Sequence, residues 1–199
     1  DILLKHFETQ SFKGFGVEDL SHGIIAAGAA LHYLKETEHP NLQHITSLQR
    51  IDQDDFLWMD RFTIRNLELL QTGIENGRCL MDVLNHTVSP MGARLLKRWL
   101  VFPLKDIARI RERLDLVEFF IRETELAAHI VHCLKQTGDI ERLVSKIPLR
   151  KISPREVMQL AKGLQQVSRI RQQAATADND YLQRLNEQLN PCDHILQKI

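Results

Sequence analysis

The sequence is short of cysteine and has no excess of either charge. Its three cysteines in 199 residues form an odd, scattered set, which excludes a disulfide framework and favours a reducing, intracellular setting. Its 26 basic side chains are balanced by 26 acidic ones, so the formal net charge is zero. This balance argues against an electrostatic grip on nucleic acid along the whole chain, but it leaves room for a local basic patch.

Long apolar runs and the usual catalytic motifs are also missing. No run of about 18 apolar residues occurs, so no membrane span is expected. The N-terminus lacks a signal-peptide pattern. None of the nine glycines precedes a lysine, which excludes a P-loop, and no Gly-x-Ser-x-Gly elbow is present. The chain starts at Asp1 and ends without a helix stop signal, which predicts a piece of a longer protein.

What is present is a series of helical patterns. The expected helices cover about 2–7, 21–37, 63–70, 89–101, 107–123, 125–137, 139–147, 154–173 and 181–189. Side chains suited to N-caps precede four of them: Ser21, Ser89, Asp106 and Ser153. Gly138 suits the end of the helix before it. The predicted fold class is mainly α, a helical bundle with a small β-hairpin near residues 45–60, where apolar and polar residues alternate.

Apolar spacing predicts which helix faces are buried. The longest helix carries a stripe of Val157, Leu160, Leu164, Val167 and Ile170. The helix after Asp106 carries a stripe of Ile107, Ile110, Leu114, Val117 and Ile121. The helix that begins near Ser21 is expected to be deeply buried, because Gly23 and Gly28 would allow another backbone to approach closely.

The segment "NHTVSPMGARLLKRWLVFPL", residues 85–104, raises the question of nucleic-acid binding. Arg94, Lys97 and Arg98 lie on one expected helix and are the candidates for contact with DNA phosphates. Two interpretations stay open, a helix that binds a phosphate backbone and a face that is solvated or paired within the chain. Amphipathicity alone explains the pattern, because the remaining positions are apolar: Leu95, Leu96, Trp99 and Leu100.

Catalytic and metal chemistry have weaker candidates. His129, His132 and Cys133 could supply zinc ligands from one helix, although zinc would need a further ligand from elsewhere. This leaves a metal-dependent enzyme as one hypothesis, against a helix whose polar positions happen to be histidine. Cys79 has no base near it in the sequence, and the paired acids Asp54 and Asp55 fall in a turn where solvated carboxylates are expected.

Six segments in order resemble the bacterial MutS family of DNA mismatch repair proteins: 26–37, 60–69, 80–104, 110–120, 139–147 and 153–160. In "DRFTIRNLEL" the residues that match the family's Asp-x-x-x-x-Arg-Asn-Leu-Glu pattern are Asp60, Arg65, Asn66, Leu67 and Glu68. In the segment 80–104 the residues that match Thr-x-x-x-Met-Gly-x-Arg are Thr87, Met91, Gly92 and Arg94. The ordered matches cover nearly the whole chain.

The resemblance implies a domain organisation. Residues 1–20 would be a tail from the connector domain, and residues 21–199 the first segment of the core, or lever, domain. The clamp, the returning half of the core and the ATPase domain would lie outside this chain. Leu95, Leu96, Trp99 and Leu100 would then be bundle core, Gly92 a close-packing position, and Arg94 a residue with an intramolecular partner.

The resemblance also implies a function. The segment would couple the ATPase mechanically to the clamp and mismatch-reading domains, without an active site or cofactor of its own. The parent protein would be an ATPase that binds ATP and Mg²⁺ in the absent domain. Its partners would be the remaining MutS domains, mismatched double-stranded DNA, a MutL-type protein and a second copy, with no membrane, in the bacterial cytoplasm near the nucleoid. The alternative is a stand-alone helical protein-interaction module, which binds a partner through its apolar stripes.

Overall fold

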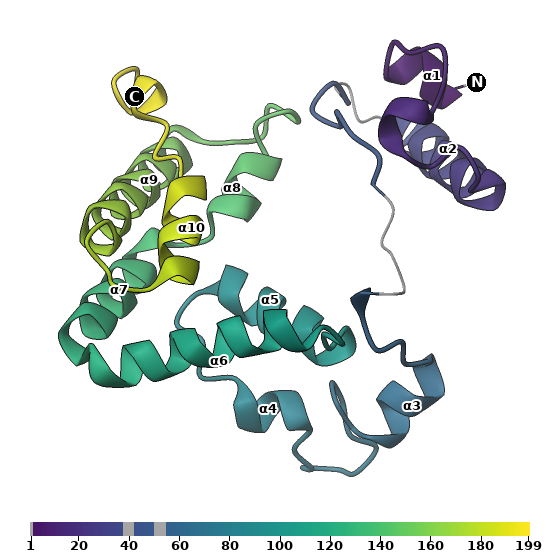
Figure 1. Ribbon diagram of the computed structural model, residues 1–199. Coiled ribbons are helices and arrows are strands. Elements are labelled where there is room, and N and C mark those ends of the chain that lie inside the picture. Colours follow the sequence, from purple (N-terminus) through teal and green to yellow (C-terminus); the bar gives the residue numbers. More distant parts are fainter. Residues whose placement is uncertain (1, 38–41, 50–54) are drawn as a thin grey trace. The chain divides into compact units, whose positions relative to one another are not determined.

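The computed structural model describes residues 2–37, 42–49 and 55–199, and its regular structure is mainly α (Figure 1). The chain divides into two compact units, residues 1–52 with 144–152 and residues 53–143 with 153–199. Each unit has its own buried apolar clusters. In the described ranges, no helix combines the length and apolarity that crossing a membrane requires. Because the regular structure consists almost wholly of helices, the predicted mainly α fold class is confirmed.

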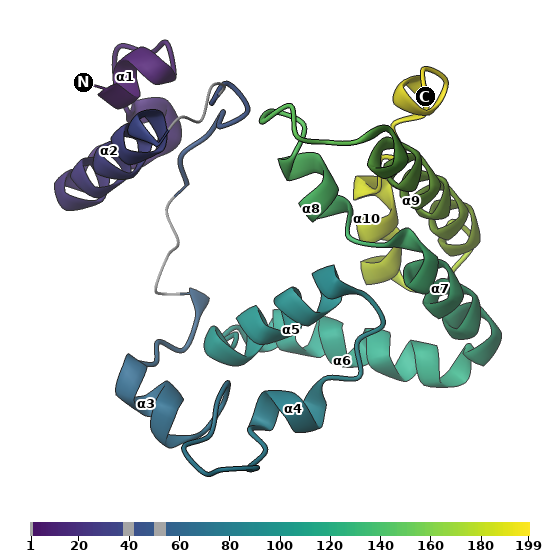
Figure 2. The same ribbon diagram turned by 180° about the vertical axis from the view of Figure 1, so that it is seen from behind.

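The N-terminal unit is built on two helices that pack against each other, α1 (Ile2–His6) and α2 (Ser21–Glu36), with a 3-10 turn at Lys13–Phe15 between them (Figure 2). Its core consists of Leu3, Leu31 and Leu42, with partly buried residues around them: Phe7, Phe12, Ile24, Ala27, Leu34 and Ile45. The ring of His6 adds a 2.9 Å hydrogen bond between Nε2 and the carbonyl of Ile45, which ties the segment after α2 back to α1.

The expectation that α2 is deeply buried is wrong. Leu31 is its one buried residue, and Ile25 is 69% exposed. A Cβ at Gly28 would lie 3.8 Å from the Leu3 side chain, an ordinary contact, so no neighbouring backbone requires glycine there. Ser21 is the first helical residue rather than the N-cap; Leu20 takes the cap position without a side-chain hydrogen bond.

The larger unit begins with four helices: α3 (Arg61–Asn66), α4 (Leu80–Leu84), α5 (Pro90–Val101) and α6 (Ile107–Arg122). The predicted caps of the two longer helices are confirmed. Ser89 Oγ accepts from the backbone N–H of Gly92 at 3.1 Å, and Asp106 accepts from Ala108 N–H at 2.7 Å. Each cap satisfies an N–H that has no partner inside its helix, and this fixes where the helix starts.

The β-hairpin predicted near residues 45–60 is not found among the described residues of that segment. Residues 42–49 contain no strand, and residues 50–54 lie outside the described part. Phe56 forms one antiparallel bridge with Leu104, supported by a 2.8 Å hydrogen bond from Leu57 N–H to the Pro103 carbonyl. The apolar residues 56–58 thus pair with the chain that leaves α5, where the ring of Phe102 packs against Phe56 and Trp58.

Five further helices follow, of which α8 ends just past the boundary of the larger unit: α7 (Thr124–Thr137), α8 (Ile140–Ser145), α9 (Pro154–Ala174), α10 (Asp180–Gln188) and α11 (Asp193–Leu196). The longest, α9, begins after Ser153 as predicted. A capping box forms there, in which Ser153 and Glu156 satisfy each other's backbone N–H groups. Helices α7, α10 and α11 pack against it. Leu160 and Leu164 of the predicted stripe are buried, with Leu143 of α8 in the same cluster.

The face of α6 that meets its neighbours is not the predicted one. Four of the five stripe residues are more than half exposed: Ile107, Leu114, Val117 and Ile121. The helix instead packs Leu116, Phe119 and Phe120 against a cluster that contains Ala174 and Leu182. Because α6 is apolar on two sides, periodicity alone could not tell which side another helix would cover.

Gly163 sets the approach of α9 to the end of α7. A Cβ at this position would lie 2.5 Å from the carbonyl oxygen of Thr137 and 3.1 Å from Cγ1 of Ile140. A contact of 2.5 Å with backbone cannot be relieved by a side-chain rotation. Any larger residue would therefore push the two helices apart, although glycine inside a helix costs about 1 kcal/mol relative to alanine.

We predict that Gly163→Ala lowers the free energy of unfolding by about 1–3 kcal/mol, since overpacking outweighs the gain in helix propensity. Urea unfolding followed by circular dichroism measures the change. Gln165→Ala, at an exposed position two residues along the same helix, is the matched control and should be neutral or slightly stabilising. Equal stability of the Gly163→Ala and native chains would contradict the close approach.

Candidate functional site

Arg94, on the basic helix α5, is paired inside the chain. Its guanidinium donates to both carboxylate oxygens of Asp139, at 3.0 and 2.7 Å, and its Nε donates to Oε2 of Glu141 at 2.9 Å. The two acids flank the start of α8, and Asp139 also accepts from the backbone N–H of Arg142. The expectation of an intramolecular partner for Arg94 is confirmed.

The charges in this cluster stabilise each other. The hydrogen bonds from Arg94 hold the pKa of Asp139 below its ordinary value near 3.8, and burial of the carboxylate opposes the shift. The same bonds to Asp139 and Glu141 raise the pKa of Arg94 further above its already high value. A bidentate arginine–carboxylate pair with a second acid has strong geometric specificity. The Nε, Nη1 and Nη2 atoms of Arg94 thus all have acceptors within the chain.

The apolar residues of α5 are less buried than bundle core would be. Leu95 and Trp99 are exposed, whereas Leu96 and Leu100 are half-buried, so the predicted core positions are only partly correct. Trp99 is covered by a charge instead, with the guanidinium carbon of Arg113 3.7 Å from the ring centroid. Figures 1 and 2 both show α5 and α6 side by side.

The space for a side chain at Gly92 is limited by residues just before its own helix. A Cβ there would lie 3.1 Å from Ser89 Oγ and 3.5 Å from the Cβ of Thr87. Its tight contacts are therefore with the residues that cap α5, where its own N–H is the donor to Ser89. The close packing predicted at this position is confirmed, and its partner is the helix cap.

Most other cations around α6 also have partners. Arg109 lies 3.8 Å from Asp55, Arg122 pairs with Glu118 one turn away, and Arg184 of α10 reaches Glu112. Arg113 covers Trp99. These exposed pairs contribute little stability each, but they engage four cations of this part of the surface within the chain.

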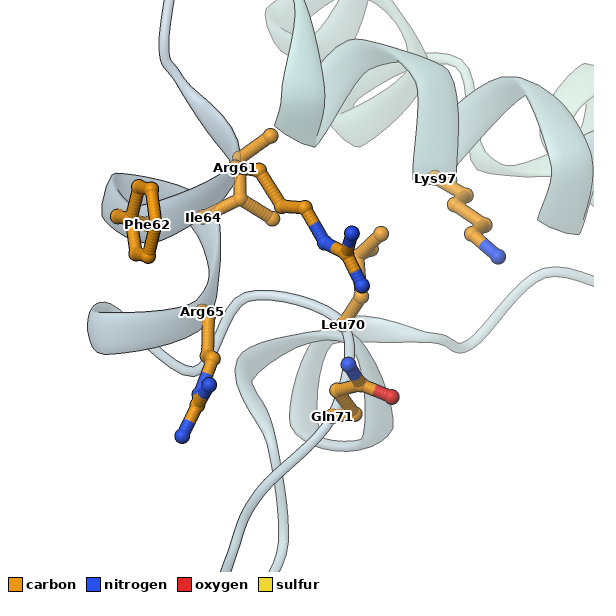
Figure 3. A pocket seen from close by; sticks show the side chains of 7 residues that line it. All are labelled: Arg61, Phe62, Ile64, Arg65, Leu70, Gln71 and Lys97. Atoms are coloured by element: carbon orange, nitrogen blue, oxygen red, sulfur yellow. The ribbon is translucent and has the colours of Figure 1, made fainter.

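Lys97 lies beside a hollow that the sequence analysis did not anticipate (Figure 3). The hollow has a volume of about 600 Å³ and is lined by Arg61, Phe62, Ile64, Arg65, Leu70, Gln71 and Lys97. Its lining holds three cations and no acidic residue. In Figure 3 the side chain of Arg61 extends toward Leu70 and Gln71, that of Lys97 descends from α5 with its ammonium turned away from Arg61, and that of Arg65 points away from the hollow.

Local hydrogen bonds fix the wall of this hollow. Asp60 caps α3 by accepting from Thr63 N–H at 2.7 Å, and hydrogen bonding from the side chain of Thr63, together with this backbone bond, lowers the pKa of Asp60. The helix ends where Glu68 adopts a positive φ of 48°. The following segment is tied to the start of α4 by the bonds Leu80 N–H to Glu68 O and Met81 N–H to Leu69 O, both 2.9 Å.

Of the three predicted DNA candidates, the structure brings only Lys97 to this hollow. Arg94 is engaged with Asp139 and Glu141, and Arg98 is exposed outside the lining. Arg61 and Arg65 were missed as site residues. Their i, i+4 spacing was a visible signal, but their proximity to Lys97 arises only from folding.

The metal hypothesis gains no support from the positions of its ligands. Cys133 is buried in α7, whereas His129 and His132 are exposed, so the three side chains do not converge on one face. A ring nitrogen of His132 is 2.7 Å from the amide nitrogen of Gln136. Throughout residues 2–37, 42–49 and 55–199, no group of three or more potential ligands is arranged to hold a metal ion.

Cys79 has a structural position at the start of α4. It is 2% exposed, and its thiol donates to Asp82 at 3.0 Å within a capping box. This bond is the main cause of a lowered pKa at Asp82. Of the two acids predicted in a turn, Asp55 pairs with Arg109, and Asp54 lies outside the described residues.

Comparison with known proteins gives two family matches. The family MutS domain III matches residues 62–199, and MutS domain II matches residues 1–46. The chain is 48% identical over its full length to the DNA mismatch repair protein MutS of Cytophaga hutchinsonii. It is 53% and 50% identical, over 99% of its length, to the proteins of the same name from Phocaeicola vulgatus and Bacteroides thetaiotaomicron. It spans about 23% of the length of these curated relatives.

We predict that Arg94→Gln lowers the melting temperature at pH 7, because the carboxylates of Asp139 and Glu141 lose their shared donor. The folded-state pKa of Asp139 is depressed, so its stabilisation is full above the ordinary value near 3.8 and is lost as pH falls through the folded value. The difference between variant and native chains should therefore shrink below about pH 4.

Thermal unfolding across pH 3–8 tests this, with Arg98→Gln as a control on the same helix. The double variant Arg94→Gln/Asp139→Asn should lose less than the sum of the two single losses. Additive losses, or a difference from the native chain that stays constant with pH, would show that the pair does not couple α5 to α8.

Proposed function

Because the chain belongs to the MutS family of DNA mismatch repair proteins, we propose that it is a non-catalytic core segment that transmits movement between other domains of such a protein. In this proposal residues 62–199, which match MutS domain III, belong to the core, or lever, domain, and residues 1–46, which match MutS domain II, belong to the connector domain before it. The function rests on rigid helices rather than on a reactive side chain.

The observation that carries the proposal is the continuity of α9. Its 21 residues, Pro154–Ala174, run without a break and correspond to about 32 Å of helix. It is capped at its start, approached closely by α7 at Gly163, and braced by α10 and α11. Transmission over such a distance requires an element that moves as one body, and a braced helix of this length meets that requirement.

The outward face of α6 supports the same proposal. Ile107, Leu114, Val117 and Ile121 form an exposed apolar row on one helix. Side chains of this kind are usually covered in a working protein, since each gains about 1.5–3 kcal/mol when it is fully buried. The chain matches less than a quarter of its relatives' length, so their remaining parts are the natural cover. A stand-alone interaction module, the alternative, would use this same row for a foreign helix.

ATP and Mg²⁺ would be bound elsewhere in such a protein. The residues present here do not fit nucleotide phosphates in the usual way, since none of the nine glycines is followed by lysine. Mismatched duplex DNA, a MutL-type protein and a second copy are the proposed partners of the whole protein. Its proposed location is the bacterial cytoplasm near the nucleoid.

We predict that the 199-residue chain neither hydrolyses ATP nor distinguishes a mismatched duplex from a matched one. Phosphate release with ATP and Mg²⁺ should equal that of a heat-inactivated sample. Fluorescence anisotropy at physiological salt should give the same affinity for both duplexes, within error. Turnover above the control, or selective binding of the mismatch, would defeat the proposal of a non-catalytic segment.

We further predict that Leu114→Ser with Ile121→Ser reduces binding of a hydrophobic dye by the chain without a large change in melting temperature. The same substitutions at the corresponding positions of a complete MutS protein should destabilise it, because there the row would be buried. Arg111→Ser, exposed on the same helix, controls for the lower helix propensity of serine. Unchanged stability of the complete protein would favour the stand-alone module.

A further inference from the structure

We propose that the hollow between α3 and α5 is a binding site for a phosphate group carried on a sugar. Arg61 and Lys97 would hold the phosphate, and the side-chain amide of Gln71 offers a further donor at the floor of the hollow. This proposal does not depend on the mechanical role of the chain, because it concerns a local surface that the transmission of movement does not use.

The charge pattern is the first argument. The lining of the hollow carries three positive charges and no negative one, in a chain whose total charge is zero. Neither Arg61 nor Lys97 forms an ion pair with any residue of the described ranges, unlike Arg94, Arg109 and Arg184. Two cations brought to one hollow from separate helices repel each other unless an anion lies between them. An anion bound in the hollow would offset both charges.

The geometry distinguishes this place from an ordinary solvated basic face. Arg61 comes from α3 and Lys97 from α5, and both line the hollow; in Figure 3 the guanidinium of Arg61 reaches over Leu70 and Gln71, and the ammonium of Lys97 ends on the other side of the space, away from Arg61. Arg65 lines a neighbouring hollow as well, together with Glu68, so its charge is partly offset there and the site rests on the other two cations. A guanidinium fork and an ammonium group that line one hollow are both suited to the oxygens of a phosphate.

The apolar wall indicates what the phosphate is attached to. Phe62, 70% exposed, lies in the lining with Ile64 and Leu70. A bare inorganic ion would leave these side chains in water, whereas a sugar or base attached to the phosphate would cover them. The ligand chemistry is thus a sugar phosphate. It can come from two sources, the backbone of a nucleic acid or a free mononucleotide.

The test is a titration of the ¹⁵N-labelled chain followed by NMR, with a short DNA duplex and with adenosine monophosphate in separate arms. We expect shifts of the backbone amides of Leu70, Gln71 and Lys97. Arg61→Gln and Lys97→Gln should each weaken binding about tenfold, as expected for loss of a charge-assisted hydrogen bond. Arg98→Gln is the matched control, because it removes an exposed charge next to Lys97 that does not line the hollow.

Circular dichroism melting of each variant verifies that it is folded. If the duplex binds through the hollow, the plot of log K against log salt should become shallower by about 0.9 for each phosphate contact that a variant removes. Shifts with the duplex alone would assign the site to a nucleic-acid backbone, and shifts with the mononucleotide alone would assign it to a free nucleotide. Both results support a sugar-phosphate site.

Three results would overturn the proposal. The first is the absence of shifts at Leu70, Gln71 and Lys97 with either ligand. The second is binding that survives both Arg61→Gln and Lys97→Gln, or that Arg98→Gln weakens as much. The third is an equal response to a hexaglutamate peptide at the same concentration, which would mean that the hollow responds to negative charge and not to phosphate. None of these results bears on ATP hydrolysis or on the apolar row of α6, so the two proposals can fail separately.

Discussion

The larger unit depends on the short turn that joins α7 to α8. On one side the carbonyl of Thr137 lies against Gly163, so that the backbone of α9 is in direct contact with the end of α7. Gly138 follows with a φ of 71°, a conformation that favours glycine. On the other side Asp139 and Glu141 receive Arg94 from α5. One turn thus connects the longest helix to the basic helix, through a steric contact and an ionic one.

These two contacts have different consequences for movement. The contact at Gly163 is a packing constraint, which resists separation of α7 and α9 under all conditions. The Arg94 pair is half exposed and ionic, so it can be broken and remade at small cost. Helices α7 and α9 are thus held together by packing, while the ionic link between α5 and α8 is reached by solvent. In the proposed role, the packed contact would keep its shape and the ionic one could change.

Local signals in the sequence predicted the helices well and their surroundings less well. The caps at Ser89, Asp106 and Ser153 are read from residues a few positions apart, and all three were found. The outward face of α6, the exposure of α2 and the pairing of Phe56 with Leu104 depend on which distant segments come together. Periodicity identifies an apolar face, but it does not identify the neighbour that covers it or state that one is present.

The candidate site shows the same limit for charge. A total charge of zero argues against a chain-wide affinity for polyanions, but it does not say where single positive charges gather. Folding distributes them unevenly, because each carboxylate neutralises the cation that it reaches in space. Asp139 pairs with an arginine of α5, Glu112 with one of α10 and Asp55 with one of α6. Arg61 and Lys97 meet at a place that no acid lines, so a neutral chain still presents a local positive field.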